Sequence, residues 1–301
     1  MTDLTRTDLQ TQAVTAPPLR RPRRRTHTWW KSLLKHTALI ALSLLMIYPL
    51  IWMVISSLKP NHMIFSDLSI FTTELSLEHY IHGWDAQVLP FHHFLINSGI
   101  LVLGAIIGNL ISCSLAAYAF ARLDFRFRPA YFAVMLGTIL LPFHVVLVPQ
   151  FILFRSLGWL DTFLPLIVPK FLAVESFFIF LMVQFIRALP DELFEAARMD
   201  GAGHFRTFVQ VTLPLMVPAL ATTTIFTFIW TWGDFFGPLI YLRSRDNFPV
   251  SLALMGFIDA QSSSNYGAMF AMSVVSLIPL FIVFLIGQKF LVKGFATSGI
   301  K

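Results

Sequence analysis

The sequence predicts an all-α membrane protein with six transmembrane helices. Hydrophobic residues make up 56% of its 301 residues and charged residues only 13%, which is about half the charged share of an ordinary soluble domain. Several charge-free runs are long enough to cross a hydrocarbon core, which needs about 20 apolar residues. Basic residues gather at both ends of the chain. Both termini are therefore expected on the cytoplasmic side, which requires an even number of spans.

The first 30 residues are expected to form a disordered, basic cytoplasmic tail, and residues 31–301 the transmembrane domain. The tail is rich in Thr, Pro and Arg and has no apolar periodicity, so it cannot bury a core. Five arginines between Arg20 and Arg25 supply most of the net charge of +6. A basic cluster beside an apolar run marks the cytoplasmic face and contacts anionic lipid. We therefore expect membrane lipid, and no nucleic acid, as a partner.

The first span is expected over residues 37–58, which contain no charged residue. A cleaved signal peptide would have a shorter apolar core and a small-residue cleavage site, so this run is predicted to stay as a membrane helix. The polar residues 59–92 are expected to form an external loop. Four of the nine histidines lie between His79 and His93, but no carboxylate or Cys accompanies them at a ligand spacing. No metal site is predicted.

The second and third spans are expected over residues 94–121 and 129–154. The second span carries small residues spaced four apart, which form a stripe on one helix face where another helix can approach closely. The stripe consists of Gly104, Gly108, Ser112 and Ala116. The third span is interrupted by Pro142 and Pro149. Prolines interrupt membrane helices where protein or a cavity satisfies the freed carbonyls, so this span is either part of a transport pathway or a kinked helix.

The fourth span, over residues 166–187, has the weakest signal. It contains Lys170 and Glu175, and only residues 176–186 are free of charge, a run too short to cross by itself. We keep this span because the basic termini require an even number, and because its omission would place the polar segment 189–213 outside the cell. The last two spans are expected over residues 214–242 and 267–288.

The polar segment 189–213 is expected to contain two short helices. Pro190 suits a first helical turn, and the acidic pair after it favours the positive end of a helix. This helix should stop near Gly201, where tolerance of positive φ allows a sharp turn. A second short helix is expected over about residues 205–211. Two adjacent alanines would let the first helix lie close against another protein surface, so we expect this segment to dock.

The segment contains the motifs Glu195-Ala196-Ala197, Asp200-Gly201-Ala202 and Leu213-Pro214. Their residue types and spacing resemble the cytoplasmic coupling loop of ABC importer permeases, most closely the carbohydrate importers of the maltose type. The resemblance implies the type I ABC importer permease fold, in which a coupling helix fits a groove on the ATPase subunit. The residues implied to couple to the ATPase are Glu195, Ala196, Ala197, Asp200, Gly201 and Gly203.

The resemblance also implies the partners of the chain. Glu195 would pair with a basic group of the ATPase, Gly201 would supply the turn, and the chain would lie in the bacterial inner membrane. The expected partners are a second, different permease subunit, an ATPase subunit dimer and an extracytoplasmic solute-binding protein. No Gly-x-x-x-x-Gly-Lys-Ser/Thr phosphate loop occurs in the chain. ATP and magnesium are therefore expected on the partner ATPase, with no cofactor and no catalytic residue in this chain.

The outer part of the fifth span reads Trp230-Thr-Trp-Gly-Asp-Phe-Phe-Gly-Pro-Leu. It again resembles the sugar importers, in which a Trp-Asn-acidic-aromatic pattern is usual, but Gly233 stands where the pattern has Asn. Any contact of that Asn is therefore missing or replaced here. The candidate substrate-pathway residues are Trp230, Trp232 and Asp234, because aromatic faces stack on sugar rings and carboxylates accept hydroxyl hydrogen bonds. The alternative is that the aromatic residues anchor the helix at the membrane interface.

Two other classes of protein fit the sequence less well. A secondary transporter driven by an ion gradient would need ionisable residues at mid-membrane, and the clearest spans contain none. A membrane enzyme would need a nucleophile, a metal set or facing carboxylates, and the Gly-x-Ser-x-Gly and His-Glu-x-x-His motifs are absent. The sequence thus favours a permease subunit that forms half of an ATP-driven import pathway for a sugar or sugar-like solute.

Overall fold

The computed structural model describes residues 29–70, 74–258 and 265–297, and all regular secondary structure within these ranges is helical. The chain divides into two compact units, Met1–Pro49 and Leu50–Lys301, and each is described by itself. The predicted basic tail lies outside the described residues except for its last two positions.

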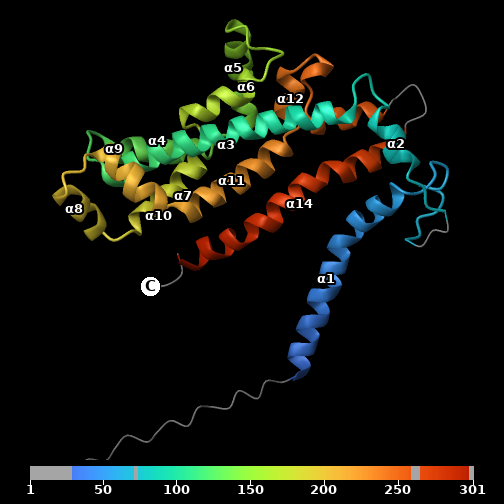
Figure 1. Cartoon of the computed structure of the whole chain (residues 1–301), viewed down its shortest axis with the longest axis horizontal. Helices are drawn as coiled ribbons and strands as arrows, with labels where there is room; N and C mark the ends of the chain where they lie inside the picture. Colours follow the sequence, from blue (N-terminus) through green and yellow to red (C-terminus); the bar gives the residue numbers. More distant parts are fainter. Residues whose placement is uncertain (1–28, 71–73, 259–264, 298–301) are drawn as a thin grey trace, which may run out of the picture. The chain divides into compact units, whose positions relative to one another are not determined.

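Most of the helices follow one another with short connections, and the connection from α1 to α2, residues 57–77, is longer (Figure 1). In chain order they are α1 (Trp29–Ser56), α2 (Glu78–Trp84), α3 (Phe91–Arg122), α4 (Arg128–Thr138), α5 (Phe143–Ser156), α6 (Leu164–Ile167), η1 (Val168–Leu172), α7 (Ser176–Arg187), α8 (Glu192–Met199), α9 (His204–Thr207), η2 (Phe208–Thr212), α10 (Leu213–Leu215), α11 (Val217–Trp232), α12 (Phe236–Tyr241), η3 (Arg245–Asn247), α13 (Val250–Ala253), η4 (Leu254–Phe257) and α14 (Tyr266–Thr297). Of the four short η elements, η2 is a π-helix and the others are 3-10 helices.

The first unit contains most of α1, a helix whose sides are apolar and exposed. None of the residues in its most apolar stretch is buried, which suits a helix surrounded by lipid. Trp29 and Trp30 stand at its N-terminal end with their ring centroids 4.6 Å apart. Aromatic side chains at such a position favour the membrane–water interface.

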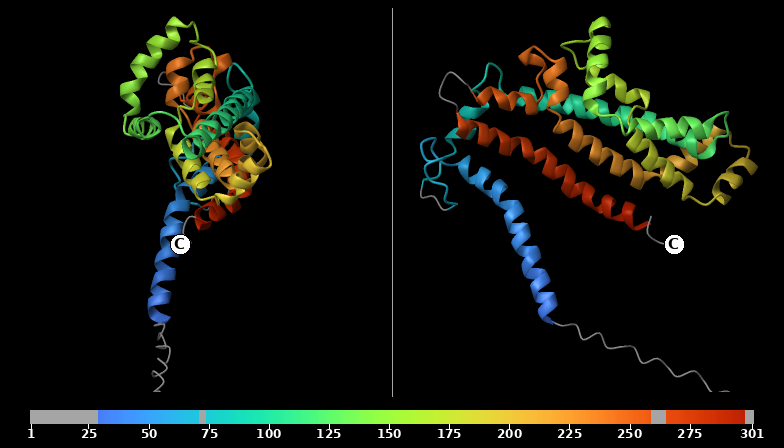
Figure 2. Two further views of the ribbon diagram at one scale, coloured as in Figure 1. Left: turned by 90° about the vertical axis from the view of Figure 1, so that its left-hand side faces the viewer. Right: turned by 180° about the vertical axis from the view of Figure 1, so that it is seen from behind.

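The second unit is built around long helices that run side by side. α11 lies between α3 and α14, and the view from behind keeps this order (Figures 1 and 2). α7 packs against α3 and α11. α8 lies at one end of this unit and α2 at the other (Figure 1). The predicted docking segment and the predicted external loop are therefore at opposite ends.

Four helices among the described residues are long and apolar enough to cross a membrane, and the number is five if one bent pair of helices counts as a single span. The four are Trp29–Ser56, Phe91–Arg122, Leu164–Arg187 and Tyr266–Lys289. The bent pair consists of His204–Leu215 and Val217–Trp232, which meet at 75°. The four helices overlap the first, second, fourth and sixth predicted spans, and the bent pair overlaps the fifth.

The third predicted span is divided in two. α4 ends at Thr138 and α5 begins at Phe143, and neither part is long enough to cross alone. Pro142 is the residue before α5, whereas Pro149 lies inside that helix. The predicted interruption thus occurs at Pro142, because a proline has no N–H to continue a helix but can stand at its start.

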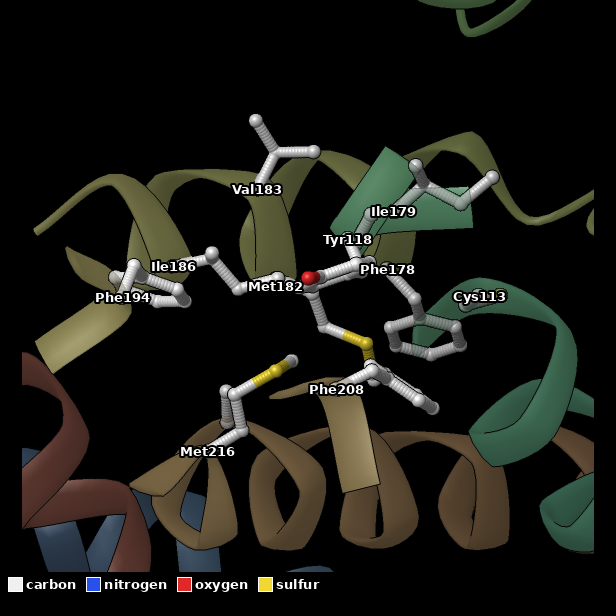
Figure 3. Packing of buried hydrophobic residues seen from close by; sticks show 12 residues of the cluster. Cys113, Tyr118, Phe178, Ile179, Met182, Val183, Ile186, Phe194, Phe208 and Met216 are labelled. Atoms are coloured by element: carbon white, nitrogen blue, oxygen red, sulfur yellow. The ribbon is translucent and has the colours of Figure 1, made fainter. Parts of the chain in front are cut away.

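The largest buried cluster lies where α3, α7 and the segment before α11 meet. Met182 is fully buried and extends from α7 toward Phe208 of η2 (Figure 3). The ring of Tyr118 on α3 lies 5.3 Å from that of Phe208. Lipid is as apolar as these side chains, so the cluster stabilises the fold mainly through close packing. Phe194 of α8 belongs to the same cluster, which anchors α8 to the second unit.

The small-residue stripe on α3 is confirmed as a surface of close approach. A Cβ atom at Gly104 would lie 2.9 Å from the Ile167 side chain, and one at Gly108 would lie 2.9 Å from Cβ of Lys170. The hydroxyl of Ser112 donates a hydrogen bond to the carbonyl oxygen of Lys170 at 2.7 Å. The stripe therefore holds the end of α6 and η1 directly against α3.

Gly108→Ala is expected to destabilise the protein by about 1–3 kcal/mol, the usual cost of overpacking a close contact. Gly99→Ala is the matched control, since it lies on the same helix with no atom within 4 Å of the added Cβ. Both changes raise helix propensity alike, so the difference between their thermal unfolding curves in detergent isolates the clash. Equal stability of the two variants would show that η1 does not press on α3.

Candidate functional site

The docking segment begins with α8, whose charges complement the helix dipole. Glu192 and Glu195 lie in its first turn and Arg198 in its last, so each charge faces the helix end of opposite sign. Pro190 was predicted in the first turn but lies just before the helix, because Asp191 takes the N-cap position.

The end of α8 is a Schellman motif. The N–H of Ala202 donates to the carbonyl oxygen of Ala197 at 2.9 Å, and the N–H of Gly201 donates to that of Arg198 at 3.0 Å. Gly201 has a φ of 74°, a conformation that glycine adopts without strain. The predicted glycine stop is confirmed.

α8 has one buried face and one exposed face. Phe194 is 5% exposed and Ala197 is 9% exposed, so both pack within the chain. The structure thus splits the predicted pair of contact alanines, because Ala197 faces inward while Ala196 faces outward. The exposed residues among those predicted to couple are Glu195, Ala196, Asp200, Gly201 and Gly203.

Three apolar side chains of α8 and α9 that the sequence analysis did not single out are also exposed. Met199 is 88% exposed, Phe205 is 73% exposed and Leu193 is 40% exposed. Exposed apolar groups gathered in one segment mark interaction sites. The helical period could have revealed Met199, because Phe194 and Ala197, three residues apart, share the buried face and Met199 falls on the opposite side of α8.

Arg122, at the end of α3, ties the docking segment to the membrane helices. One guanidinium nitrogen pairs with the carboxylate of Asp191, and another donates to the carbonyl oxygens of Ile186 and Leu189 at 2.8 and 2.9 Å. The guanidinium carbon lies 3.7 Å from the centroid of the Phe194 ring. A single side chain thus joins α3, the end of α7 and α8.

A cavity of about 430 Å³ lies farther along the second unit, among residues of α3, α5, α11, α12 and the α6–η1 segment. Its volume falls within the range of small-molecule sites, which combine apolar walls with a few polar groups. The polar side chains of the lining are Gln150, Lys170, Glu175, Thr231, Asp234 and Tyr241.

The structure brings Trp230 and Asp234 to this cavity but places Trp232 elsewhere. Trp230 stacks on Phe178 of α7 with ring centroids 5.1 Å apart. The indole N–H of Trp232 donates to the carbonyl oxygen of Ser276 at 3.0 Å. Trp232 therefore links α11 to α14 and does not line the cavity.

The fifth predicted span is interrupted beside the cavity. α11 ends at Trp232, and α12 begins at Phe236. The carboxylate of Asp234 accepts a hydrogen bond from the N–H of Gly237 at 3.1 Å. A Cβ atom at Gly237 would lie 2.5 Å from the same carboxyl group. The continuous helix expected here becomes a helix, a turn and a second helix, because Gly233 and Asp234 both favour helix ends.

The turn between η1 and α7 contributes two charges to the cavity. Ala173 in this turn has a φ of 55°, so the helix cannot continue through it. The ammonium group of Lys170 donates a hydrogen bond to the Glu175 carboxylate across the turn. The charges that weakened the fourth predicted span thus lie outside the regular α-helix.

Asp161 joins two loops next to the cavity. Its carboxylate accepts hydrogen bonds from the N–H groups of Arg243 and Ser244 at 2.9 and 2.8 Å and from the Ser244 hydroxyl. The Asn247 amide donates to its carbonyl oxygen at 2.7 Å. The N–H of Asp161 donates to the carbonyl oxygen of Tyr241, a residue of the cavity lining. These hydrogen bonds, led by that of the Ser244 hydroxyl, hold the pKa of Asp161 well below its usual value.

No group of three His, Cys, Asp or Glu side chains is placed to hold a metal ion in the described part of the chain. Two histidines of the predicted external region have backbone partners instead. The His79 ring is hydrogen-bonded to the carbonyl oxygen of Lys59 at 2.8 Å, and the His93 ring to that of Asp246 at 2.7 Å. These rings therefore hold loop backbone in place.

Helices broken around a cavity are tolerated at membrane depth only where protein or a water-filled space satisfies the freed backbone groups, as in transporters. Residues 100–297 match the family model described as "Binding-protein-dependent transport system inner membrane component". The chain belongs to this family of inner membrane permeases.

Several characterised relatives cover most of the chain. It is 31% identical to the diacetylchitobiose uptake system permease protein NgcG of Streptomyces coelicolor, over 85% of this chain and 84% of the relative. It is 30% identical to the arabinooligosaccharides transport system permease protein AraQ of Bacillus subtilis, over 86% of this chain and 92% of the relative. It is 29% identical to the trehalose/maltose transport system permease protein MalG of Thermococcus litoralis, over 87% and 94%.

A solved structure has the same fold. The crystal structure of a bacterial ABC transporter involved in the import of the acidic polysaccharide alginate contains a chain that matches with a TM-score of 0.79. The match covers 89% of this chain and 99% of the other, at 23% sequence identity. The chain therefore has an ABC permease fold.

Arg122→Ala is expected to loosen the docking segment by about 1–3 kcal/mol, because it removes the charged hydrogen bonds to the carbonyl oxygens of Ile186 and Leu189 and the ion pair with Asp191. Hydrogen exchange of residues 189–203 should become faster. Arg126→Ala is the control, since this exposed arginine of the adjacent loop lies over Phe127 alone; we expect it to change stability by about 0.5 kcal/mol or less. Unchanged exchange in the Arg122 variant would mean that α8 is held by its apolar contacts only.

Asp161→Asn is expected to lower the thermal unfolding temperature at neutral pH, and the difference from the wild type should shrink in acid. The folded pKa of Asp161 is depressed, so its contribution to stability is complete above the unfolded pKa of about 3.9 and is lost as the pH falls below it. Asp124→Asn serves as the control, because this carboxylate is fully exposed beside Arg128. A pH-independent difference for Asp161→Asn would contradict the assignment.

Proposed function

We propose that this chain is one of two permease subunits of an ATP-driven importer, and that it forms half of the pathway for a sugar or sugar-like solute. The family match carries the proposal, together with the three relatives, which are named as permeases for diacetylchitobiose, arabinooligosaccharides and trehalose or maltose. The cavity suits such a solute. Trp230 offers an aromatic face, and the carboxyl, amide and hydroxyl groups around it can bond to sugar hydroxyls.

In this proposal the chain crosses the bacterial inner membrane six times, with both termini in the cytoplasm. α4 and α5 together provide the third crossing as a broken helix. The basic residues at both chain ends support this orientation. The position of α8 and α2 at opposite ends of the second unit supports it as well.

Residues 190–203 are the part that docks on the ATPase subunits. The exposed face of α8 would supply the contact, with Ala196 and Met199 packing closely and Glu195 pairing with a basic group of the ATPase. ATP and magnesium bind to that partner, and this chain holds no cofactor and catalyses no reaction. An extracytoplasmic binding protein delivers the solute at the opposite end.

α7 is the element that passes motion from the docking segment to the cavity. Arg122 holds the carbonyl oxygens at its C-terminal end, while Glu175 at its N-terminal end lines the cavity. A helix of 12 residues is about 18 Å long, and its peptide hydrogen bonds make it rigid. A displacement of α8 therefore reaches the turn that carries the Lys170–Glu175 pair.

Gly201→Asp is expected to abolish uptake while the protein still inserts and assembles, because the turn that orients α8 is disturbed. Gly158→Asp is the matched control. Gly158 also has a positive φ, 70°, and neither glycine has an atom within 4 Å of an added Cβ, so both changes introduce similar backbone strain.

Uptake is measured in proteoliposomes that contain the complex purified from native membranes, with ATP inside and the binding protein outside. The proposal requires that wild-type uptake depends on both. Normal uptake by the Gly201 variant would contradict the proposal that this turn is needed for docking on the ATPase. Uptake driven by an ion gradient without ATP would assign the chain to the secondary transporters instead.

A further inference from the structure

The cavity contains two carboxyl side chains but only one cationic group. Glu175, Asp234 and Lys170 all belong to its lining. The Lys170 ammonium already donates to the Glu175 carboxylate. Within the described lining, no cation is therefore left to pair with a negatively charged solute, whereas acceptors for hydroxyl groups are present.

The backbone of both Lys170 and Glu175 is held in place by neighbouring groups. The carbonyl oxygen of Lys170 accepts the hydrogen bond of Ser112, and the close approach of Gly108 fixes its Cβ. The carbonyl oxygen of Glu175 accepts the N–H of Ile179 in the first turn of α7 at 3.1 Å. The two side chains are 28% and 26% exposed. They are thus accessible from the cavity and held at a fixed separation.

A sugar carboxylate and a sugar hydroxyl meet this pair differently. A carboxylate that bonded to Lys170 would share this single positive charge with Glu175, so that at least two carboxylates would face one cation in a partly buried site, which is costly. A hydroxyl can donate to Glu175 or Asp234 and accept from Lys170 while the ion pair stays intact. The wall of the cavity therefore favours neutral, hydroxyl-rich solutes.

We propose that this cavity selects neutral sugars against acidic ones, and that the Lys170–Glu175 ion pair is the group that sets this selectivity. The proposal rests on the function proposed above and names the solute class of the same pathway. The fold by itself does not decide this point, since a chain of the same fold belongs to an importer of an acidic polysaccharide. The charges in the lining decide it.

The test uses the whole importer, purified from native membranes into lipid nanodiscs without its binding protein. Binding of gluco-, galacto- and manno-trisaccharides is measured by ligand-observed NMR titration and compared with their uronate counterparts, which carry carboxylates in place of the hydroxymethyl groups. At least one neutral trisaccharide should bind more tightly than its uronate by about tenfold, the factor of one charge-assisted hydrogen bond. A uronate that binds as tightly as its neutral partner, or no binding by any neutral sugar, overturns the proposal.

Two variants break the same ion pair, and they change the net charge of the cavity in opposite directions. Glu175→Gln frees Lys170 and is expected to tighten uronate binding by about tenfold. Lys170→Gln removes the cation and is expected to give no such gain. An equal gain in both variants, or no gain in an assembled Glu175→Gln complex, contradicts the role of the pair. Should neither variant assemble, the wild-type comparison decides.

The ATPase activity of the same nanodiscs separates this proposal from the function on which it rests. Stimulation by the solute-loaded binding protein is expected in the wild-type complex. Loss of that stimulation would count against the import function itself. Normal stimulation combined with a preference for uronates would leave the import function standing and reject only the selectivity for neutral sugars.

Discussion

The close contact between the small-residue face of α3 and η1 sets the position of everything around the cavity. Gly108 leaves no room for a side chain between the two elements, Gly104 does the same against Ile167 at the end of α6, and Ser112 adds a hydrogen bond to the η1 backbone. Apolar helices gain little free energy when they exchange lipid contacts for contacts with one another. Close packing and interhelical hydrogen bonds of this kind are therefore the main source of helix association in a membrane. The contact fixes Lys170 and the turn from which α7 starts.

α3 and α7 are joined a second time at the other end, by Arg122. It donates hydrogen bonds to the carbonyl oxygens of Ile186 and Leu189, at a helix end where carbonyl groups lack partners within the helix. Fixed at both ends, the two helices form one rigid element. α8 is attached to it through the Asp191 carboxylate and the Phe194 ring, so the exposed docking face and the cavity belong to one mechanical unit.

The cavity lies where helices are broken, and the breaks explain its polar lining. At Ala173 and at Gly233 the chain leaves the helical path, which frees backbone groups that lipid could not satisfy. Nearby protein groups take over this role. The Asp234 carboxylate receives the N–H of Gly237, and the Ser112 hydroxyl bonds to η1. Polar side chains are thus gathered at one place inside an otherwise apolar unit, which is what a path for a hydrophilic solute needs.

The sequence by itself determined the helical class, the overlap with five of the spans, a proline break in the third span and the glycine stop of α8 near Gly201, because each depends on local composition or backbone preference. It did not determine which of the two prolines breaks the third span, since Pro149 lies inside α5. Only the tertiary structure decided which way side chains face. It turned Ala197 inward, bonded Trp232 to α14 and brought the Lys170–Glu175 pair into a cavity with Asp234. Such placements depend on residues far away in the chain. The helical period shows which side chains share a face of a helix, but it does not show which other helix packs against that face.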